Sequence, residues 1–292
     1  MTALGNPFEN ADHLRSIFYH FQSERRLDLM YTVQLWNEVP GMCEENPVLD
    51  CYIPEEKKSD VAMVILPGGG YRGRVEHEGK GFAEYFNQRG ITAFVCHYRV
   101  SPHTFPLPLL DARRAIRYVR YHCEEFGINK NKVYIIGSSA GGHLAATTSS
   151  YNDPIEFEGL DEIDNENFRP NAQILCYPVI NLADETITHL GSAQHLLGDR
   201  YPADAAKCSP DLYADEQTPP TFIWHNCTDK IVNVTNALEY AKRLRSVNVP
   251  VELHVFPYGF HGMATCPNDP YIGTWTDHMF SWMELIEREN MI

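Results

Sequence analysis

The sequence predicts an α/β protein in which a mostly parallel β-sheet is covered by helices on both faces. Uninterrupted apolar runs recur along the chain, for example at 61–66, 91–98 and 172–180, and segments with helical spacing separate them. Strands that are apolar on both faces are typical of parallel sheets flanked by helices. The chain has 292 residues and 43% hydrophobic content, which suffices for the core of one domain of this class. We therefore expect a single domain over residues 1–292.

The N-terminal part is predicted to form an arm and two edge strands. Residues 1–30 mix aromatic and charged residues with helix-like spacing, and we expect an arm that covers either the site or a partner subunit. Residues 31–36 and 47–53 alternate enough to form antiparallel edge strands, with a turn at Pro40 and Gly41.

Six further strands are expected to build the rest of the sheet. The pattern places them at 61–66, 91–98, 133–136, 172–180, 221–225 and 251–256. Helical spacing predicts helices at 79–89, 110–126, 234–246 and 274–288, with a small-residue helix after the strand at 133–136. We expect the arginines of the helix at 110–126 on its exposed side.

Three segments are predicted to lie outside this alternation. The proline-rich stretch 102–108 is interpreted as a loop, and the acidic stretch 152–170 as a surface excursion. Residues 181–219 show no strand signal and only short helical pieces such as 192–197. Long segments of this kind often cover a binding site, so we predict a cap-like insertion there.

The stretch from Lys132 to Ser149 contains the most informative motif. A β-branched and aromatic run leads into Gly137-Ser138-Ser139-Ala140-Gly141, which fits the G-x-S-x-G pattern of a strand, a sharp turn and a helix. The glycines are needed because a Cβ at either position would collide with the crowded turn. Ser139 is in register with the pattern, whereas Ser138 is not.

Further polar groups are expected beside Ser139, because functional groups gather at the carboxyl ends of parallel strands. Asp229 and His261 each follow a predicted strand, and a run of glycines at 68–70 follows another. The chain order of serine, aspartate and histidine is that of an α/β-hydrolase site. A serine hydroxyl needs an adjacent base, and an ionised aspartate fixes the tautomer of the histidine. Other residues of the same types are interpreted as structural: Asp199, Asp211, Asp215, His143, His225 and His254.

The glycine run at 68–70 has two interpretations on its own. Bare backbone N–H groups can face a ligand there, because no side chain shields them, or the run can be a flexible loop. A neighbouring serine nucleophile favours the first, since acyl transfer needs donors for the developing oxyanion.

Composition limits the partners that we expect. The formal net charge is -15 at pH 7, and an acidic protein is repelled by nucleic acid and by anionic membranes, although solubility alone explains such a charge. The N-terminus lacks the features of a secretion signal, and no stretch approaches the roughly 18 apolar residues of a membrane span. The eight cysteines form no C-x-x-C pair. We predict a cytoplasmic protein with no nucleic-acid or membrane partner, and a homo-oligomer is left open.

Taken together, these motifs resemble those of a known family. From about Leu35 to Trp282 the chain resembles the α/β-hydrolase superfamily, and within it the acetyl esterase and acetylxylan esterase-like group related to the hormone-sensitive-lipase branch. The markers are Pro67-Gly68-Gly69-Gly70-Tyr71, His97-Tyr98-Arg99-Val100, Asp111-Ala112-Arg113-Arg114-Ala115, Gly137-Ser138-Ser139-Ala140-Gly141-Gly142-His143, Pro219-Pro220-Thr221-Phe222, Asp229 and Phe260-His261-Gly262.

The resemblance implies an α/β-hydrolase fold and a serine esterase that needs no metal or cofactor. It implies an oxyanion hole formed by the backbone N–H groups of Gly69, Gly70 and Ala140. The substrates that it implies are short acyl esters, above all acetyl groups on a sugar or xylo-oligosaccharide. Pro67 at the start of the glycine run, where the lipase branch usually has histidine, disfavours long acyl chains.

The substrate and even the reaction leave alternatives open. Tyr71, and Tyr201 or Tyr213 in the cap-like segment, are candidates for stacking on a sugar ring, although packing in the core explains them equally. An amide or formamide hydrolase on the same scaffold is the alternative enzyme. A hydrolase-fold protein that binds ligands without chemistry is the alternative outside enzymes.

Overall fold

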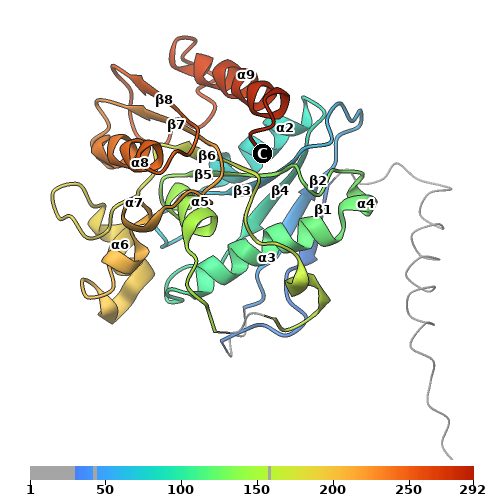
Figure 1. Cartoon of the computed structure of the whole chain (residues 1–292), viewed down its shortest axis with the longest axis horizontal. Helices are drawn as coiled ribbons and strands as arrows, with labels where there is room; N and C mark the ends of the chain where they lie inside the picture. The colour runs from blue at the N-terminus through green and yellow to red at the C-terminus, as the bar shows by residue number, and fades with distance from the viewer. Residues whose placement is uncertain (1–29, 42–44, 157–158) are drawn as a thin grey trace, which may run out of the picture.

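The computed structural model describes residues 30–41, 45–156 and 159–292. Apart from Met30, the predicted N-terminal arm lies outside the described residues. Within them the chain forms an eight-stranded sheet in the order β1-β2-β4-β3-β5-β6-β7-β8 (Figure 1). The strands are β1 Met30–Gln34, β2 Val48–Tyr52, β3 Ala62–Leu66, β4 Thr92–His97, β5 Val133–Ser138, β6 Ala172–Cys176, β7 Thr221–Asn226 and β8 Val251–Phe256.

The strand directions agree with the prediction from the sequence. β1 pairs with β2 and β2 with β4 in the antiparallel sense, and the remaining neighbours are parallel. Parallel strands need crossover connections, which the helices provide. The helices are α2 Glu76–Asn87, α3 Leu107–Tyr121, α4 Cys123–Phe126, α5 Ala140–Ser150, α6 Leu190–Leu197, α7 Pro210–Tyr213, α8 Thr235–Ser246 and α9 Trp275–Arg288, with short 3-10 turns at Glu162–Asn165, Gly198–Arg200, Ala206–Cys208 and Ile272–Thr274.

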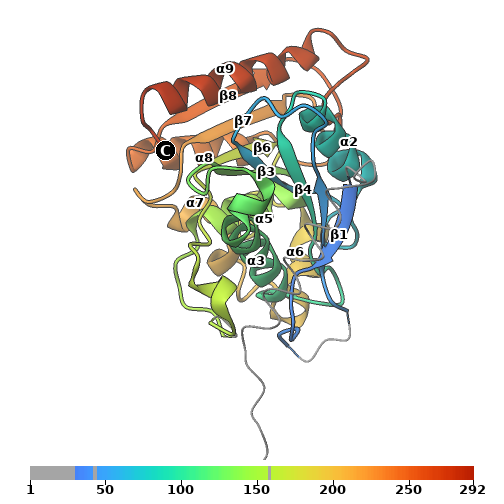
Figure 2. The ribbon, with the colours of Figure 1, turned by 90° about the vertical axis from the view of Figure 1, so that its right-hand side faces the viewer.

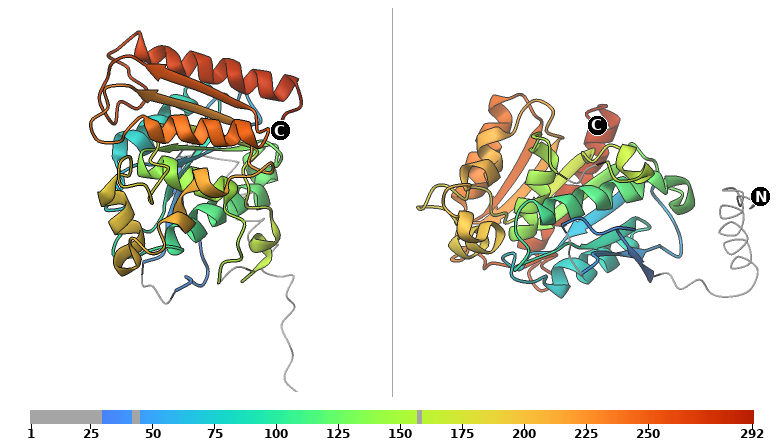
Figure 3. Two further views of the ribbon diagram at one scale, coloured as in Figure 1. Left: turned by 60° about the vertical axis from the view of Figure 1, so that its left-hand side comes forward. Right: turned by 90° about the horizontal axis from the view of Figure 1, so that it is seen from below.

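Helices cover both faces of the sheet, as the apolar strands predict. Successive residues of a strand point to opposite faces, so Val64 of β3 belongs to the core cluster that includes residues of α3, α5 and α8, whereas Ile65 belongs to the cluster that includes residues of α2 and α9. Figures 1 and 2 show α2 and α9 on the side of the sheet opposite α3 and α5. α6 lies at the other end of the molecule from α4 (Figure 3).

The helix predicted at 110–126 differs from the prediction in its length and in its exposed side. α3 begins earlier, at Leu107, since proline is tolerated in the first helical turn, and it ends at Tyr121 before the separate short α4. Its arginines were expected on the exposed side, which is wrong: Arg113, Arg114, Arg117 and Arg120 are all buried.

The physical reason is that the segment around Glu162–Asn165 packs against α3 and that partners for the arginines lie nearby. Arg114 bonds Asp161 at 2.6 Å and Asp164 at 3.0 Å, and Arg117 donates to the Glu166 carbonyl at 3.0 Å. The described residues 159–170 of the predicted surface excursion therefore lie over α3, and their carboxylates pair with two of the buried guanidinium groups, those of Arg114 and Arg117.

No helix in the described part of the chain is long and apolar enough to cross a membrane.

Candidate active site

Ser139 lies in the sharp turn between β5 and α5 and has a positive φ of 53°. The steric argument for the flanking glycines holds here. A Cβ on Gly137 would lie 2.2 Å from the Gly141 carbonyl oxygen, and a Cβ on Gly141 would lie 2.1 Å from the Leu66 carbonyl oxygen. The backbone of Ser139 is fixed by hydrogen bonds to Cys176 at 3.0 Å and from Val179 at 3.1 Å. The turn thus holds a serine hydroxyl at the end of the central strand.

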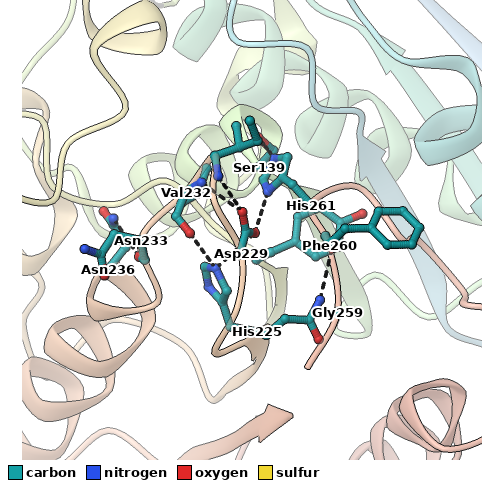
Figure 4. A network of polar contacts seen from close by, with 12 residues as sticks. Ser139, His225, Asp229, Val232, Asn233, Asn236, Gly259, Phe260 and His261 are labelled. Atoms are coloured by element: carbon teal, nitrogen blue, oxygen red, sulfur yellow. Dashed lines mark hydrogen bonds and ion pairs between the residues drawn. The ribbon is translucent and has the colours of Figure 1, made fainter. Parts of the chain in front are cut away.

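Three predicted residues meet at this point, although they are far apart in the sequence (Figure 4). His261, from the loop after β8, places Nε2 2.8 Å from Ser139 Oγ. Its Nδ1 lies 2.7 Å from Asp229 Oδ2, in the loop after β7. The other carboxylate oxygen of Asp229 accepts the backbone N–H groups of Ile231 at 2.9 Å and Val232 at 3.0 Å.

The surroundings of Asp229 keep its carboxyl group ionised. Burial alone would raise its pKa, but hydrogen bonds from His225 and His261 outweigh this and hold the pKa well below its usual range. An ionised carboxylate only accepts hydrogen bonds, so His261 Nδ1 carries the proton. His261 Nε2 is then the free acceptor, and it faces the hydroxyl of Ser139.

His225 lies behind Asp229 and is fully buried. Its Nε2 is 3.0 Å from the Val232 carbonyl oxygen and 3.4 Å from Asp229 Oδ2. Since both neighbours are acceptors, this nitrogen is the donor. From the sequence alone His225 is interpreted as structural, and its contact with Asp229 is not expected.

A cavity of about 320 Å³ opens beside Ser139 and His261. The glycine run at Gly69 and Gly70 forms one wall, and residues of the predicted cap-like segment 181–219, among them His189 and His195, form another. Residues of this segment therefore border the cavity beside Ser139.

The backbone N–H groups of the predicted oxyanion hole lie around this cavity. Gly69 and Gly70 line it, and Ala140 follows Ser139 as the first residue of α5, where a helix leaves its N–H groups without intrahelical acceptors. Among the described groups, no hydrogen bond uses the N–H of these three residues. Gly69 and Gly70 have positive φ values of 135° and 63°, which explains why glycines are needed there.

Of the two interpretations of Tyr71, the structure supports packing in the core and not stacking on a substrate. Its side chain is 1% exposed and packs edge-on against Tyr98 and His143. Its hydroxyl bonds His143 Nδ1 at 2.8 Å, and the positive φ of 56° helps to turn the chain inward. Tyr201 and Tyr213 pack against the same core rather than lining the cavity.

Several cavity residues were not identified from the sequence, among them His189, His195 and Glu78. His189 and His195 lie in the cap-like segment, where no motif marks them. Glu78 could have been identified from the sequence, because Glu78, Phe82 and Phe86 are four residues apart and lie on the same buried face of α2. A charged residue in phase with an apolar stripe indicates a buried role.

Comparisons with known proteins find relatives by sequence and by structure. The BD-FAE family model matches residues 49–244. Endo-1,4-beta-xylanase B of Butyrivibrio fibrisolvens is 34% identical, over 80% of this chain and 37% of the relative. Acetylxylan esterase of Xylanibacter ruminicola is 33% identical, over 77% of this chain and 44% of the relative. The chain thus spans less than half the length of these two relatives.

Solved structures give a match that spans nearly the whole of the other chain. The acetyl ester-xyloside bifunctional hydrolase of Caldicellulosiruptor lactoaceticus is 37% identical, with a TM-score of 0.82 over 88% of this chain and 96% of that one. MGS-M1, an alpha/beta hydrolase enzyme from a deep-sea metagenome library, is 27% identical with a TM-score of 0.68, over 88% of this chain and 97% of that one.

Proposed function

The chain belongs to the BD-FAE family of α/β hydrolases, and from this premise we propose that it is a serine esterase for short acyl esters. Acetyl esters of sugars or xylo-oligosaccharides are the proposed substrates. The observation that carries the proposal is the hydrogen-bonded chain from Ser139 through His261 to Asp229 at the edge of a cavity. The names of the acetylxylan esterase and acetyl ester-xyloside hydrolase relatives support the choice of substrate class.

In the proposed mechanism, Ser139 Oγ attacks the ester carbonyl carbon while His261 Nε2 takes its proton. Asp229 stabilises the imidazolium that forms. The N–H groups of Gly69, Gly70 and Ala140 hold the oxyanion, and each such donor is worth roughly 10²- to 10³-fold in rate. His261 then protonates the leaving alcohol and later activates the water that releases the acid. Every proton has a partner among these residues, so we propose no metal or cofactor.

The xyloside activity in the name of one relative has no comparable support here. Glycosidases typically use two carboxyl groups about 5 to 9.5 Å apart. Among the described residues that line the cavity, the one with a carboxyl group is Glu78. Both of its oxygens already accept hydrogen bonds within the protein, from Gly68 and Tyr177.

The test is release of nitrophenol from p-nitrophenyl acetate through the first turnover, with Ser139→Ala as the blank. We expect a burst near one equivalent followed by steady turnover, both absent in the variant. A rate no higher than the blank would refute the esterase and favour a protein that binds without chemistry. Faster turnover of formamides than of matched esters would instead favour the amide hydrolase.

We also propose a cytoplasmic location and no nucleic-acid or membrane partner. The net charge of -15 and the seven unpaired cysteines in the described part of the chain support this. Fractionation of cells that make the protein tests the location, and recovery from the membrane or external fraction would refute it. Sedimentation of the purified protein tests whether it forms a homo-oligomer.

A further inference from the structure

We propose that Glu78 is a positioning residue that keeps the oxyanion loop and the histidine loop in register. Here the oxyanion loop means residues 67–71 after β3, and the histidine loop means residues 257–264 after β8. This inference rests on the proposed esterase function and adds a residue that the triad and the oxyanion donors do not include. Glu78 lies in the first turn of α2 and is 3% exposed.

One oxygen of Glu78 fixes the oxyanion loop. Its Oε2 accepts the N–H of Gly68 at 2.9 Å. Gly68 is confined between Glu78 and the nucleophile, since a Cβ added to it would lie 2.5 Å from Oε2 and 3.0 Å from Ser139 Cβ. The next two residues carry the proposed oxyanion donors. A shift of Gly68 would therefore move those N–H groups relative to Ser139.

The other oxygen of Glu78 reaches the histidine loop through Tyr177. Oε1 accepts the Tyr177 hydroxyl at 2.7 Å, and that hydroxyl oxygen accepts the N–H of Ala264 at 3.0 Å. The Tyr177 ring meets the His261 ring edge-on, with centroids 5.0 Å apart. Tyr177 thus holds the histidine loop at two points, beside His261 and three residues beyond it.

The burial of the Glu78 carboxyl group is difficult to explain by stability alone. No lysine, arginine or histidine of the described residues forms an ion pair with it. A buried carboxylate without a cation is costly, and neutral donors compensate for it only in part. What this carboxylate provides is two acceptors on one rigid helix, each directed at a different loop of the site.

The test compares Glu78→Ala, Glu78→Gln and Tyr177→Phe, with Glu84→Gln as the matched control. Glu84 lies on the same helix but is exposed and pairs with Lys80. For p-nitrophenyl acetate, we expect E78A to lower kcat by about 10- to 100-fold, which at most reaches the low end of the value of one oxyanion donor, with KM within threefold. E78Q keeps an acceptor for Gly68 and should recover activity to within about fivefold of wild type. Y177F should fall between them, and E84Q should match wild type.

A second readout separates positioning from a general structural role. A trifluoromethyl ketone forms a tetrahedral adduct with the serine and reports on the oxyanion donors. E78A should weaken its binding by the same factor as it lowers kcat/KM, at an unchanged fraction of folded protein by circular dichroism. If E78A does not fold, E78Q and Y177F decide the question by the same two measurements.

Several results would overturn the inference. These are a folded E78A with kcat within twofold of wild type, a loss confined to KM, or a loss that E78Q fails to rescue. A wild-type rate no higher than that of Ser139→Ala would instead refute the proposed function. In that case the rate at which a fluorophosphonate labels Ser139 tests Glu78, and equal rates in wild type and E78A would overturn its positioning role.

Discussion

Replacing Asp229 by asparagine tests whether its carboxylate sets the proton position on His261. The structure fixes how the asparagine must lie. Oδ1 accepts two backbone N–H groups, from Ile231 at 2.9 Å and Val232 at 3.0 Å, so the amide oxygen must occupy that position. The NH₂ group then takes the place of Oδ2, which lies 2.7 Å from His261 Nδ1.

This orientation reverses the role of the imidazole. An amide NH₂ group donates hydrogen bonds, so His261 Nδ1 has to become the acceptor and the proton moves to Nε2. Nε2 can then no longer accept the proton of Ser139. The loss of the correct tautomer costs about 10⁴-fold in kcat in a serine, histidine and aspartate site. At about 1.36 kcal/mol per factor of ten, this is about 5.4 kcal/mol of transition-state stabilisation.

The assay is steady-state turnover of p-nitrophenyl acetate, with thermal unfolding to show that D229N stays folded. Asp211→Asn is the matched control, because Asp211 is a partly buried aspartate of the cap-like segment that bonds Asn181 at 2.7 Å. We expect D211N to keep its activity. A D229N enzyme with more than a tenth of the wild-type kcat would refute the reasoning, and equal losses in both variants would remove the special role of Asp229.

Two further predictions concern stability. Burial lowers the pKa of His143 to about 4, so the unfolded chain binds a proton below about pH 6.5 that the folded protein does not accept until about pH 4. The free energy of unfolding should therefore fall as the pH drops through this window, by about 1.4 kcal/mol per pH unit from this group. Urea unfolding at pH 7, 6 and 5 measures how steeply the free energy of unfolding changes with pH. This change should be smaller for His143→Gln than for wild type, and equal changes would contradict the assignment. Arg114→Met should lower the free energy of unfolding by about 3 kcal/mol, because it removes a partner of the buried carboxylate of Asp164. Urea unfolding measures this loss, with Lys80→Met in the exposed Lys80–Glu84 pair as the control. A loss below about 1 kcal/mol for Arg114→Met, which is the size expected of an exposed pair, would contradict the prediction.

The sequence was sufficient to predict the sheet and the family. The apolar runs correspond to β3 to β7 within a few residues, because a strand buried on both faces has little freedom in composition, and the predicted last strand matches the edge strand β8. The predicted resemblance to the acetylxylan esterase-like group is confirmed by the family match and the relatives. The structure brings Ser139, Asp229 and His261 within hydrogen-bond distance, because all three follow parallel strands and therefore reach the same edge of the sheet.

Tyr71 shows where adjacency in sequence fails as a guide. It directly follows Gly70, which lines the cavity, yet its side chain points into the core and bonds His143. The direction of a side chain depends on the backbone angles, and the positive φ of Tyr71 changes the course of the chain at that residue. A composition pattern contains no information about that reversal.

The arginines of α3 were misplaced for a different reason, and Glu78 was not identified for the same one, although the sequence could have revealed both. The arginines were placed outward because solvent was taken as their partner. Arg114 finds its partner 47 residues later in Asp161, and Glu78 finds one 99 residues later in Tyr177. In both helices the charged residue is in phase with buried apolar residues, as Glu78 is with Phe82. Burial of a charged residue is tolerated only where polar partners are provided. A charged residue in phase with an apolar stripe therefore predicts a polar partner far away in the sequence. In α2 that partner is Tyr177, whose ring lies beside His261.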